Sequence, residues 1–417
     1  MTAQPLLPTD AEPPPAGSEA GVCAPAGYRA GVAAADVRGE GDRARLDIAL
    51  LVSDVPCAAA GVFTRNAVKA APVVISQLTL RQQRVQAVVL NAGNANACTG
   101  AQGFRDALAM AKAAADACDL DPRQVLVCST GVIGRPMPMD RIVSGVRAAA
   151  AILDRDRGGE AARAIMTTDT LAKTATETFV AGGTVYTVGG MAKGAGMIHP
   201  DMATLLAVVT TDAPAGAGAL DPLLRRVADA TFNCVTVDGD TSTNDTLLLL
   251  ANGAAGGEEM AAGSPELAAL EAAVLRVCED LAEQVVADAE GATKHFRVTV
   301  TGAVDAGQAR AAARTVAGSP LVKTAVHGAD PNWGRIVAAL GRSGAAFVLD
   351  RISVRIGGLA VFAGGAPVDA DLDAVRDAFT LPRIEIDVDL GAGAGVGSAW
   401  GCDLGEGYVR INADYTT

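Results

Sequence analysis

The chain has 417 residues, of which 50% are hydrophobic, 19% are charged and only 3% are aromatic. This composition is that of a globular protein long enough for two domains or one large α/β unit. With 34 Lys and Arg against 47 Asp and Glu, the formal net charge is −13. Because no basic cluster offsets this charge, we expect no nucleic-acid partner.

The first half of the chain alternates between predicted strands and predicted helices. Residues 1–21 are rich in proline and poor in apolar side chains, which predicts a disordered tail. After the tail, short β-forming runs predict strands and longer stretches with helical spacing predict helices. We expect strands at 46–52, 72–76, 84–91, 124–129, 174–180 and 184–189, and helices at 104–118 and 139–153.

The second half repeats this style. A long helix is expected from Ser264 to about Glu290, because Ser264 is a good N-cap and Pro265 suits the first helical position. Since strands and helices mix throughout, the fold class is α/β, with layered sheets covered by helices. A further helix is expected at 221–231, and strands at 204–211, 295–301, 351–356, 384–390 and 408–412.

The cysteines and the hydropathy indicate the compartment. None of the eight cysteines forms a C-x-x-C pair, which favours buried, reduced thiols over disulfides or a zinc site. No apolar run approaches ~18 residues, so no transmembrane helix is expected. The N-terminus lacks the features of a signal peptide. We therefore expect a cytoplasmic protein without a membrane partner.

Several familiar motifs can be set aside. The glycines of 391–397 do not have G-x-G-x-x-G spacing, and Lys193 lacks the spacing of a phosphate-binding loop. Residues 238–245 look like a calcium loop but lack its glycine, and Leu249 stands where its last glutamate should be. A tight polar turn is the better interpretation of this segment.

If the protein is an enzyme, its sequence must supply a general base. The chain has three histidines and no G-x-S-x-G elbow. A Ser-His-Asp hydrolase is not excluded, but an α-amine exposed by chain cleavage is another base, with a reference pKa of ~7.7–8.0. A threonine or serine whose own amine takes its proton is a known activated nucleophile.

The segment Lys193–Leu206, KGAGMIHPDMATLL, resembles the autocleavage segment of the ornithine acetyltransferase family. In that family the bond before the threonine breaks, which here is Ala203–Thr204. Further motifs similar to those of the family follow in the family's order, so the resemblance covers about Tyr28 to Thr417. They lie at 91–97, 129–134, 237–245, 290–294, 330–335 and 411–417.

The resemblance implies a set of site residues. Thr204 would be the nucleophile, and Thr130 with the Gly131 N–H would form the oxyanion hole. Each role has a plain alternative: Thr204 could simply begin a strand, and Thr130 and Gly131 could be a turn. Glu290 could be a solvated helix end and Thr417 a frayed terminus, and Thr168 could replace Thr167. The implied substrate contacts are Thr167, Lys193, Thr204, Glu290, Asn412 and Thr417.

The resemblance also implies a fold and a reaction. The fold is a layered α-β-β-α architecture, shared with N-terminal-nucleophile aminopeptidases, in which chains 22–203 and 204–417 form one intertwined unit. The reaction is ping-pong transfer of acetyl from N2-acetylornithine to glutamate through acetyl-Thr204, within an α2β2 heterotetramer. No metal or cofactor is implied, and acetyl-CoA stays open as a second donor. The alternatives are an enzyme that uses acetylornithine alone, an aminopeptidase or amidase of this fold, and an uncleaved binding protein.

Overall fold

The computed structural model describes residues 19–42, 44–81, 84–199 and 205–414. Most of the predicted tail, the predicted cleavage bond Ala203–Thr204 and the terminal Thr417 lie outside these residues. At the end of the predicted tail, Gly21 already belongs to a buried 3-10 helix, Gly21–Cys23. The last residue of the predicted tail is therefore part of the fold.

The larger of the two sheets is eight-stranded within the described residues and is built around one long strand, β2 (Ile48–Phe63). Its first half pairs with β1 and β3, and its second half pairs with β9. The register on β3 shifts between Val52 and Cys57, where β2 passes from one half of the sheet to the other. The strand order is β4-β3-β2-β9-β7-β6-β5, with β1 on β2. The other strands are β1 (Tyr28–Ala33), β3 (Val85–Asn94), β4 (Val125–Val132), β5 (Lys173–Ala181), β6 (Thr184–Lys193), β7 (Leu206–Thr211) and β9 (Thr246–Ala251).

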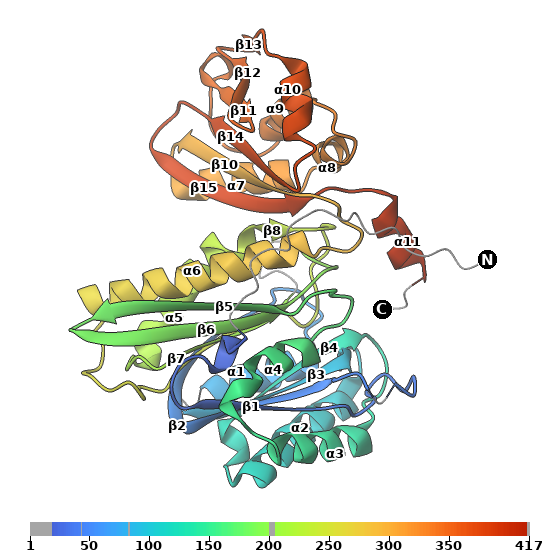
Figure 1. Ribbon diagram of the computed structural model, residues 1–417, viewed down its shortest axis with the longest axis vertical. Helices are drawn as coiled ribbons and strands as arrows, with labels where there is room; N and C mark the ends of the chain where they lie inside the picture. The colour runs from blue at the N-terminus through green and yellow to red at the C-terminus, as the bar shows by residue number, and fades with distance from the viewer. Residues whose placement is uncertain (1–18, 43, 82–83, 200–204, 415–417) are drawn as a thin grey trace.

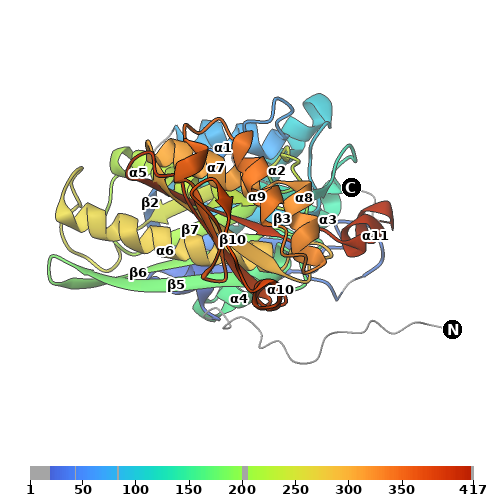
Figure 2. The ribbon, with the colours of Figure 1, turned by 90° about the horizontal axis from the view of Figure 1, so that it is seen from above.

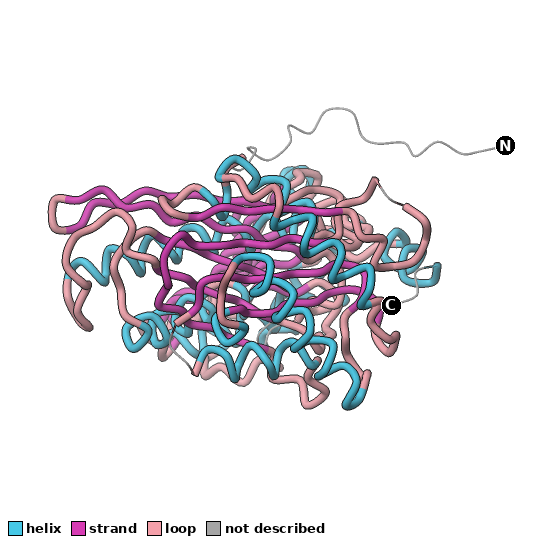
Figure 3. The backbone as a smooth tube through the Cα atoms, turned by 90° about the horizontal axis from the view of Figure 1, so that it is seen from below, coloured by secondary structure: helices cyan, strands magenta, loops and turns pink. Residues whose placement is uncertain are grey.

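The two halves of this sheet face each other, and helices cover their outer faces (Figures 1 and 3). Between the halves, side chains such as Leu51, Leu90 and Val208 share one buried core with α4. A second core joins α1, α2 and α3 to the half containing β1–β4, and a third joins α5 and α6 to the other half. This is an α-β-β-α arrangement, as predicted. The helices are α1 (Ala71–Leu80), α2 (Gly100–Cys118), α3 (Met139–Ala150), α4 (Gly158–Ala164), α5 (Ala217–Ala230) and α6 (Pro265–Ala287).

A second sheet, seven-stranded in the described chain, lies above α6 (Figures 1 and 2). Helix α7 packs on β10 and β15, and α8 and α9 follow it along the chain. The strands are β8 (Val235–Thr236), β10 (His295–Ala303), β11 (Ser353–Ile356), β12 (Leu359–Ala363), β13 (Ala366–Pro367), β14 (Arg383–Asp389) and β15 (Gly395–Cys402). The helices are α7 (Ala306–Ala317), α8 (Pro320–His327), α9 (Trp333–Gly341), α10 (Leu372–Ala378) and α11 (Glu406–Asp414), the last of which leaves this sheet and lies beside the lower layers (Figure 1).

Two predicted strands are wrong. Residues 72–76 belong to α1, because Pro72 stands in the first turn of that helix, where proline fits. The β-branched run after it was misleading. Residues 408–412 belong to α11, which has no buried residue. The other strands and helices expected in the described residues are present, with shifted ends, and Ser264 does cap α6, accepting a hydrogen bond from the Leu267 N–H.

None of the helices that the described residues form is both long and apolar enough to cross a membrane. All eight cysteines are free thiols, and six of them are buried.

Candidate active site

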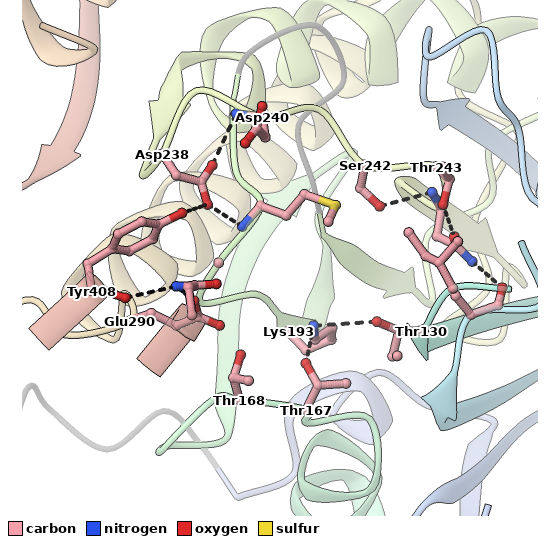
Figure 4. A pocket seen from close by; sticks show the side chains of 17 residues that line it. Thr130, Thr167, Thr168, Lys193, Asp238, Asp240, Ser242, Thr243, Glu290 and Tyr408 are labelled. Atoms are coloured by element: carbon pink, nitrogen blue, oxygen red, sulfur yellow. Dashed lines mark hydrogen bonds between the residues drawn. The ribbon is translucent and has the colours of Figure 1, made fainter. Parts of the chain in front are cut away.

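A cavity of about 240 Å³ opens where β3, β4 and β6 end, at one end of the two facing half-sheets (Figure 4). Loop 238–244 and helix α11 complete its wall. All six of the predicted site residues that the structure describes line this one cavity. They are Thr130, Gly131, Thr167, Lys193, Glu290 and Asn412.

Thr130 and Gly131 lie within β4, so the interpretation as a turn after Ser129 does not hold. Gly131 pairs with Gly93 of β3 and has a φ of +130°, a conformation that only glycine adopts readily. A Cβ at Gly131 would lie 2.3 Å from the carbonyl carbon of Gly93. The close approach of these two strand ends therefore requires glycine at the place where the predicted oxyanion donor faces the cavity.

Loop 238–244 is tied to the same strand ends. The Asn244 Nδ2 donates hydrogen bonds to the carbonyl oxygens of Ala95 (2.6 Å) and Ser129 (2.8 Å). One buried amide therefore joins the loop to the ends of both β3 and β4. These two hydrogen bonds hold the backbone that carries Thr130 and Gly131.

Lys193 is the last residue of β6 and is only 8% exposed. Its Nζ donates to the hydroxyl oxygens of Thr167 (2.7 Å) and Thr130 (3.5 Å) (Figure 4). It also lies 3.8 Å from Asp169 Oδ2. Burial lowers the pKa of Lys193, and the Asp169 carboxylate opposes that effect. Thr168 also lines the cavity, but Thr167 is the neighbour that contacts Lys193.

Glu290 follows α6, and its carboxylate packs against the backbone of Gly196. A Cβ on Gly196 would lie 2.3 Å from Glu290 Oε2, so glycine is needed for this approach. Glu290 Oε2 accepts a hydrogen bond from Asn412 Nδ2 (2.9 Å) on α11. Glu290 is therefore part of the cavity wall and not a solvated helix end.

Asp238 and Tyr408, for which the sequence analysis predicts no individual role, also line the cavity. Asp238 accepts hydrogen bonds from the backbone N–H groups of Met197 (2.5 Å) and Ile198 (2.9 Å) and from the Tyr408 hydroxyl (3.2 Å). Burial raises the pKa of Asp238, and these donors partly offset it. Asp238 thus ties the segment after β6 to α11. Asp238 belongs to the family motif at 237–245, so the sequence did contain a signal for it. Tyr408 lies in the segment that was wrongly predicted as the last strand.

Thr204, Ala203 and Thr417 lie outside the described residues, but one flank of residues 200–204 lines the cavity and the other pairs with a residue that lines it. Met197 lines it. On the other side, Leu206 opens β7 and pairs with Lys193. The described chain on either side of the predicted cleavage bond is therefore next to the predicted oxyanion hole.

These features define an α/β protein with a candidate active site of two hydrogen-bonded groups. One contains Lys193, the hydroxyls of Thr130 and Thr167, and Gly131, whose positive φ requires glycine; the other contains Glu290 and Asp238. No histidine is among the described residues that line the cavity. Such a site can bind a small molecule that carries both charges, and it can supply hydrogen-bond donors to a developing oxyanion.

Comparison with known proteins agrees with this class. Residues 29–417 match the model of the ArgJ family. The "Arginine biosynthesis bifunctional protein ArgJ" of Symbiobacterium thermophilum is 51% identical over 397 residues, which cover 95% of this chain and 98% of that protein. The protein of the same name from Mycolicibacterium paratuberculosis is 48% identical over 412 residues, covering 96% of this chain and 97% of that one.

A solved structure of ornithine acetyltransferase with ornithine from Mycobacterium tuberculosis is 45% identical and has a TM-score of 0.38. It covers 45% of this chain and 96% of that chain. From the family match and the curated relatives, this chain belongs to the ArgJ family. The resemblance seen in the sequence is confirmed, and with it the prediction of an acyltransferase enzyme.

Proposed function

We propose that the protein transfers the acetyl group of N2-acetylornithine to glutamate, giving ornithine and N-acetylglutamate for arginine biosynthesis. The shared name of its relatives, a bifunctional protein of arginine biosynthesis, supports this pathway. As the second activity, we propose that acetyl-CoA also donates acetyl to glutamate. The reaction needs no metal or redox cofactor, because the chain itself supplies base, nucleophile and oxyanion donors.

The observation that carries the proposal is the pairing of opposite charges around one cavity. N2-acetylornithine has one carboxylate, one ammonium group and the acetamide that reacts. Lys193 and Glu290 line the same cavity and suit the two charged groups. Thr130 and Gly131 supply a hydroxyl and a backbone N–H for the acetamide oxygen.

The active enzyme forms by autocleavage. The Thr204 hydroxyl attacks the carbonyl carbon of Ala203, and the Ala203–Thr204 amide becomes an ester through an N→O acyl shift. Water then hydrolyses that ester, which leaves the Ala203 carboxylate and a free α-amine on Thr204. The products are chains of residues 1–203 and 204–417, which we propose stay together as a cytoplasmic α2β2 heterotetramer.

Acetyl transfer then proceeds in two half-reactions. The α-amine of Thr204 accepts the proton of its own hydroxyl, and the oxygen attacks the acetyl carbonyl of N2-acetylornithine. The C–N bond breaks, the proton passes to the departing amine of ornithine, and acetyl-Thr204 remains. The amine of glutamate attacks this ester and leaves as N-acetylglutamate, which returns the hydroxyl to Thr204. Thr167, Asn412 and Thr417 contact the substrates in this scheme.

Mass spectrometry of the purified protein tests the proposal. We expect two chains, the second beginning Thr-Leu-Leu-Ala, and a gain of one acetyl group on that second chain when N2-acetylornithine is added alone. Glutamate should remove the acetyl group. Thr204→Ala should stay uncleaved and inactive, whereas Thr204→Ser should cleave and turn over. A wild-type chain that is intact, or transfer activity in Thr204→Ala, would contradict the mechanism, and acetate release without glutamate would indicate an amidase.

A further inference from the structure

Asp169 joins the two segments that carry Thr167 and Lys193. It lies between α4 and β5, and its side chain is fully buried. Its Oδ2 accepts a hydrogen bond from the Thr167 N–H (2.9 Å), and its Oδ1 accepts from the Gly194 N–H (2.6 Å) and from Lys173 Nζ (2.8 Å). One carboxylate therefore fixes the 167–173 segment against the end of β6, directly beside Lys193.

The contacts of Lys193 determine where two hydroxyl hydrogens point. A lysine ammonium group has three donors and no acceptor. Since Lys193 Nζ donates to the hydroxyl oxygens of Thr167 and Thr130, both hydroxyls are acceptors in these bonds. Each hydroxyl must therefore direct its own hydrogen elsewhere, and both residues line the cavity. A neutral lysine amine could accept a hydrogen bond instead and would turn a hydroxyl hydrogen away from the cavity.

We propose that Asp169 is a positioning residue that holds Lys193 charged and in place, so that Thr130 and Thr167 present their hydroxyl hydrogens to the substrate. This inference rests on the proposed function, because it gives the Thr130 hydroxyl a use in acyl transfer. It also gives Lys193 a second task besides binding a carboxylate. Asp169 itself acts only through Lys193.

The charges around Lys193 give the inference a pH signature. Burial lowers the pKa of Lys193, Asp169 and, more weakly, Glu290 and Asp245 raise it, and Lys173 lowers it. Of the three carboxylates that raise the pKa of Lys193, Asp169 has the largest effect. It is itself stable as a carboxylate: burial would raise its pKa, but Lys193 and Lys173 outweigh burial and hold that pKa well below its usual range.

Replacing Asp169 with Asn keeps the size of the side chain and removes its charge. The pKa of Lys193 should then fall further, so that Lys193 loses its proton at a lower pH than in the wild type. The Thr204 amine must be neutral to act as a base, so it governs the acidic side of the pH profile. The alkaline side of the profile should report the loss of the proton from Lys193. Asp169→Asn should therefore move only the alkaline side.

The matched control is Asp288→Asn. Asp288 holds the same segment, since it accepts hydrogen bonds from Lys173 Nζ (2.5 Å) and from the N–H groups of Thr170 (3.0 Å) and Leu171 (3.2 Å). The larger charge effects on the Lys193 pKa come from other groups: Asp169, Lys173, Glu290 and Asp245. Both variants remove one carboxylate from the same buried lysine, so a purely structural effect should appear in both.

The experiment measures the pH profile of kcat/KM for N2-acetylornithine. It compares the cleaved wild type, both single variants and the double variant Asp169→Asn/Lys193→Arg. We expect the alkaline limb of Asp169→Asn to move down by about 1–3 pH units, the range for one close opposite charge. Asp288→Asn should keep the wild-type limb. The double variant should lose the shift, because arginine stays protonated.

An unmoved alkaline limb in Asp169→Asn, or an equal shift in Asp288→Asn, would overturn the inference. If Asp169→Asn does not fold, Lys193→Arg alone decides: its alkaline limb should move up to that of the substrate's own ammonium group, at ~10.4 for a lysine-like amine, and a limb unchanged from the wild type would refute the role of Lys193. A wild type that cleaves and transfers acetyl while these shifts are absent refutes only this inference. A wild type without acetyl transfer refutes the proposed function instead.

Discussion

Replacement of Thr130 by Val is the sharpest test of the oxyanion hole, because it removes one hydroxyl and keeps the branched shape of the side chain. Among the residues that the structure describes, that oxygen accepts one long hydrogen bond, 3.5 Å, from Lys193. Lys193 would keep its 2.7 Å contact with Thr167 and its proximity to Asp169. The fold should therefore be nearly unaffected, and the loss should fall on catalysis.

The size of that loss follows from the number of donors. The Gly131 N–H remains, so one of the two proposed donors is removed. Loss of one oxyanion-hole donor lowers kcat by about 10²–10³, or ~2.7–4 kcal/mol of transition-state stabilisation. KM should change little, because the donor acts mainly on charge that develops after binding.

Steady-state acetyl transfer, measured on protein whose cleavage has been checked by mass, gives both constants. Thr167→Val is the matched control, because it removes the other hydroxyl that contacts Lys193 and should mainly raise KM. A kcat for Thr130→Val within about threefold of the wild type would refute the reasoning, because 10²–10³ is expected for a lost donor. So would the same fall in kcat in Thr167→Val.

Two further changes test the supports of the site. Lys173→Met leaves Asp169 and Asp288 without their shared, 1% exposed partner and should destabilise the fold by about 3–5 kcal/mol. The pKa of Asp169 is lowered in the folded state, so its contribution to the free energy of unfolding is present above its unfolded pKa and is lost as the pH falls towards its folded pKa. In denaturant titrations, the loss of stability in Lys173→Met should therefore be smaller at pH 3 than at pH 7. An equal loss at both pH values would contradict the ion pair. Gly131→Ala should abolish activity and lower the denaturation midpoint, whereas Gly134→Ala, with φ +80° and nothing within 4 Å of the new Cβ, should cost only ~1–2 kcal/mol of backbone strain.

The sequence predicted most of the fold because the signals of its strands and helices are local. Strands β5 and β6 are rich in β-forming residues such as Thr, Val, Phe and Tyr, and α6 has a serine cap followed by proline. The two errors have different causes. In α1 the β-branched run outweighed the proline signal. In α11 no residue is buried, so the apolar pattern carries no information about a core.

Helix α11 is fixed instead by distant contacts. A Cβ on Gly291 would lie 2.2 Å from the Tyr408 N, so two glycine-containing segments meet there. Tyr408 and Asn412 then bond to Asp238 and Glu290. Such contacts join residues more than 100 positions apart, and no local pattern reports them. For the same reason, composition and spacing alone could not have grouped the site residues, which were named through the family resemblance.

The strand order of the larger sheet has a consequence for a chain cut at Ala203–Thr204. Strands β1 to β6 would belong to one polypeptide, and β7 and β9 to the other. Yet β9 and β7 lie between β2 and β6, with main-chain ladders to the first polypeptide on both sides. Dilution alone should therefore not separate the two polypeptides, since parting them means unfolding the sheet. After denaturation they would have to find each other again, so recovery of activity should depend on protein concentration, whereas the first folding of the uncut chain should not.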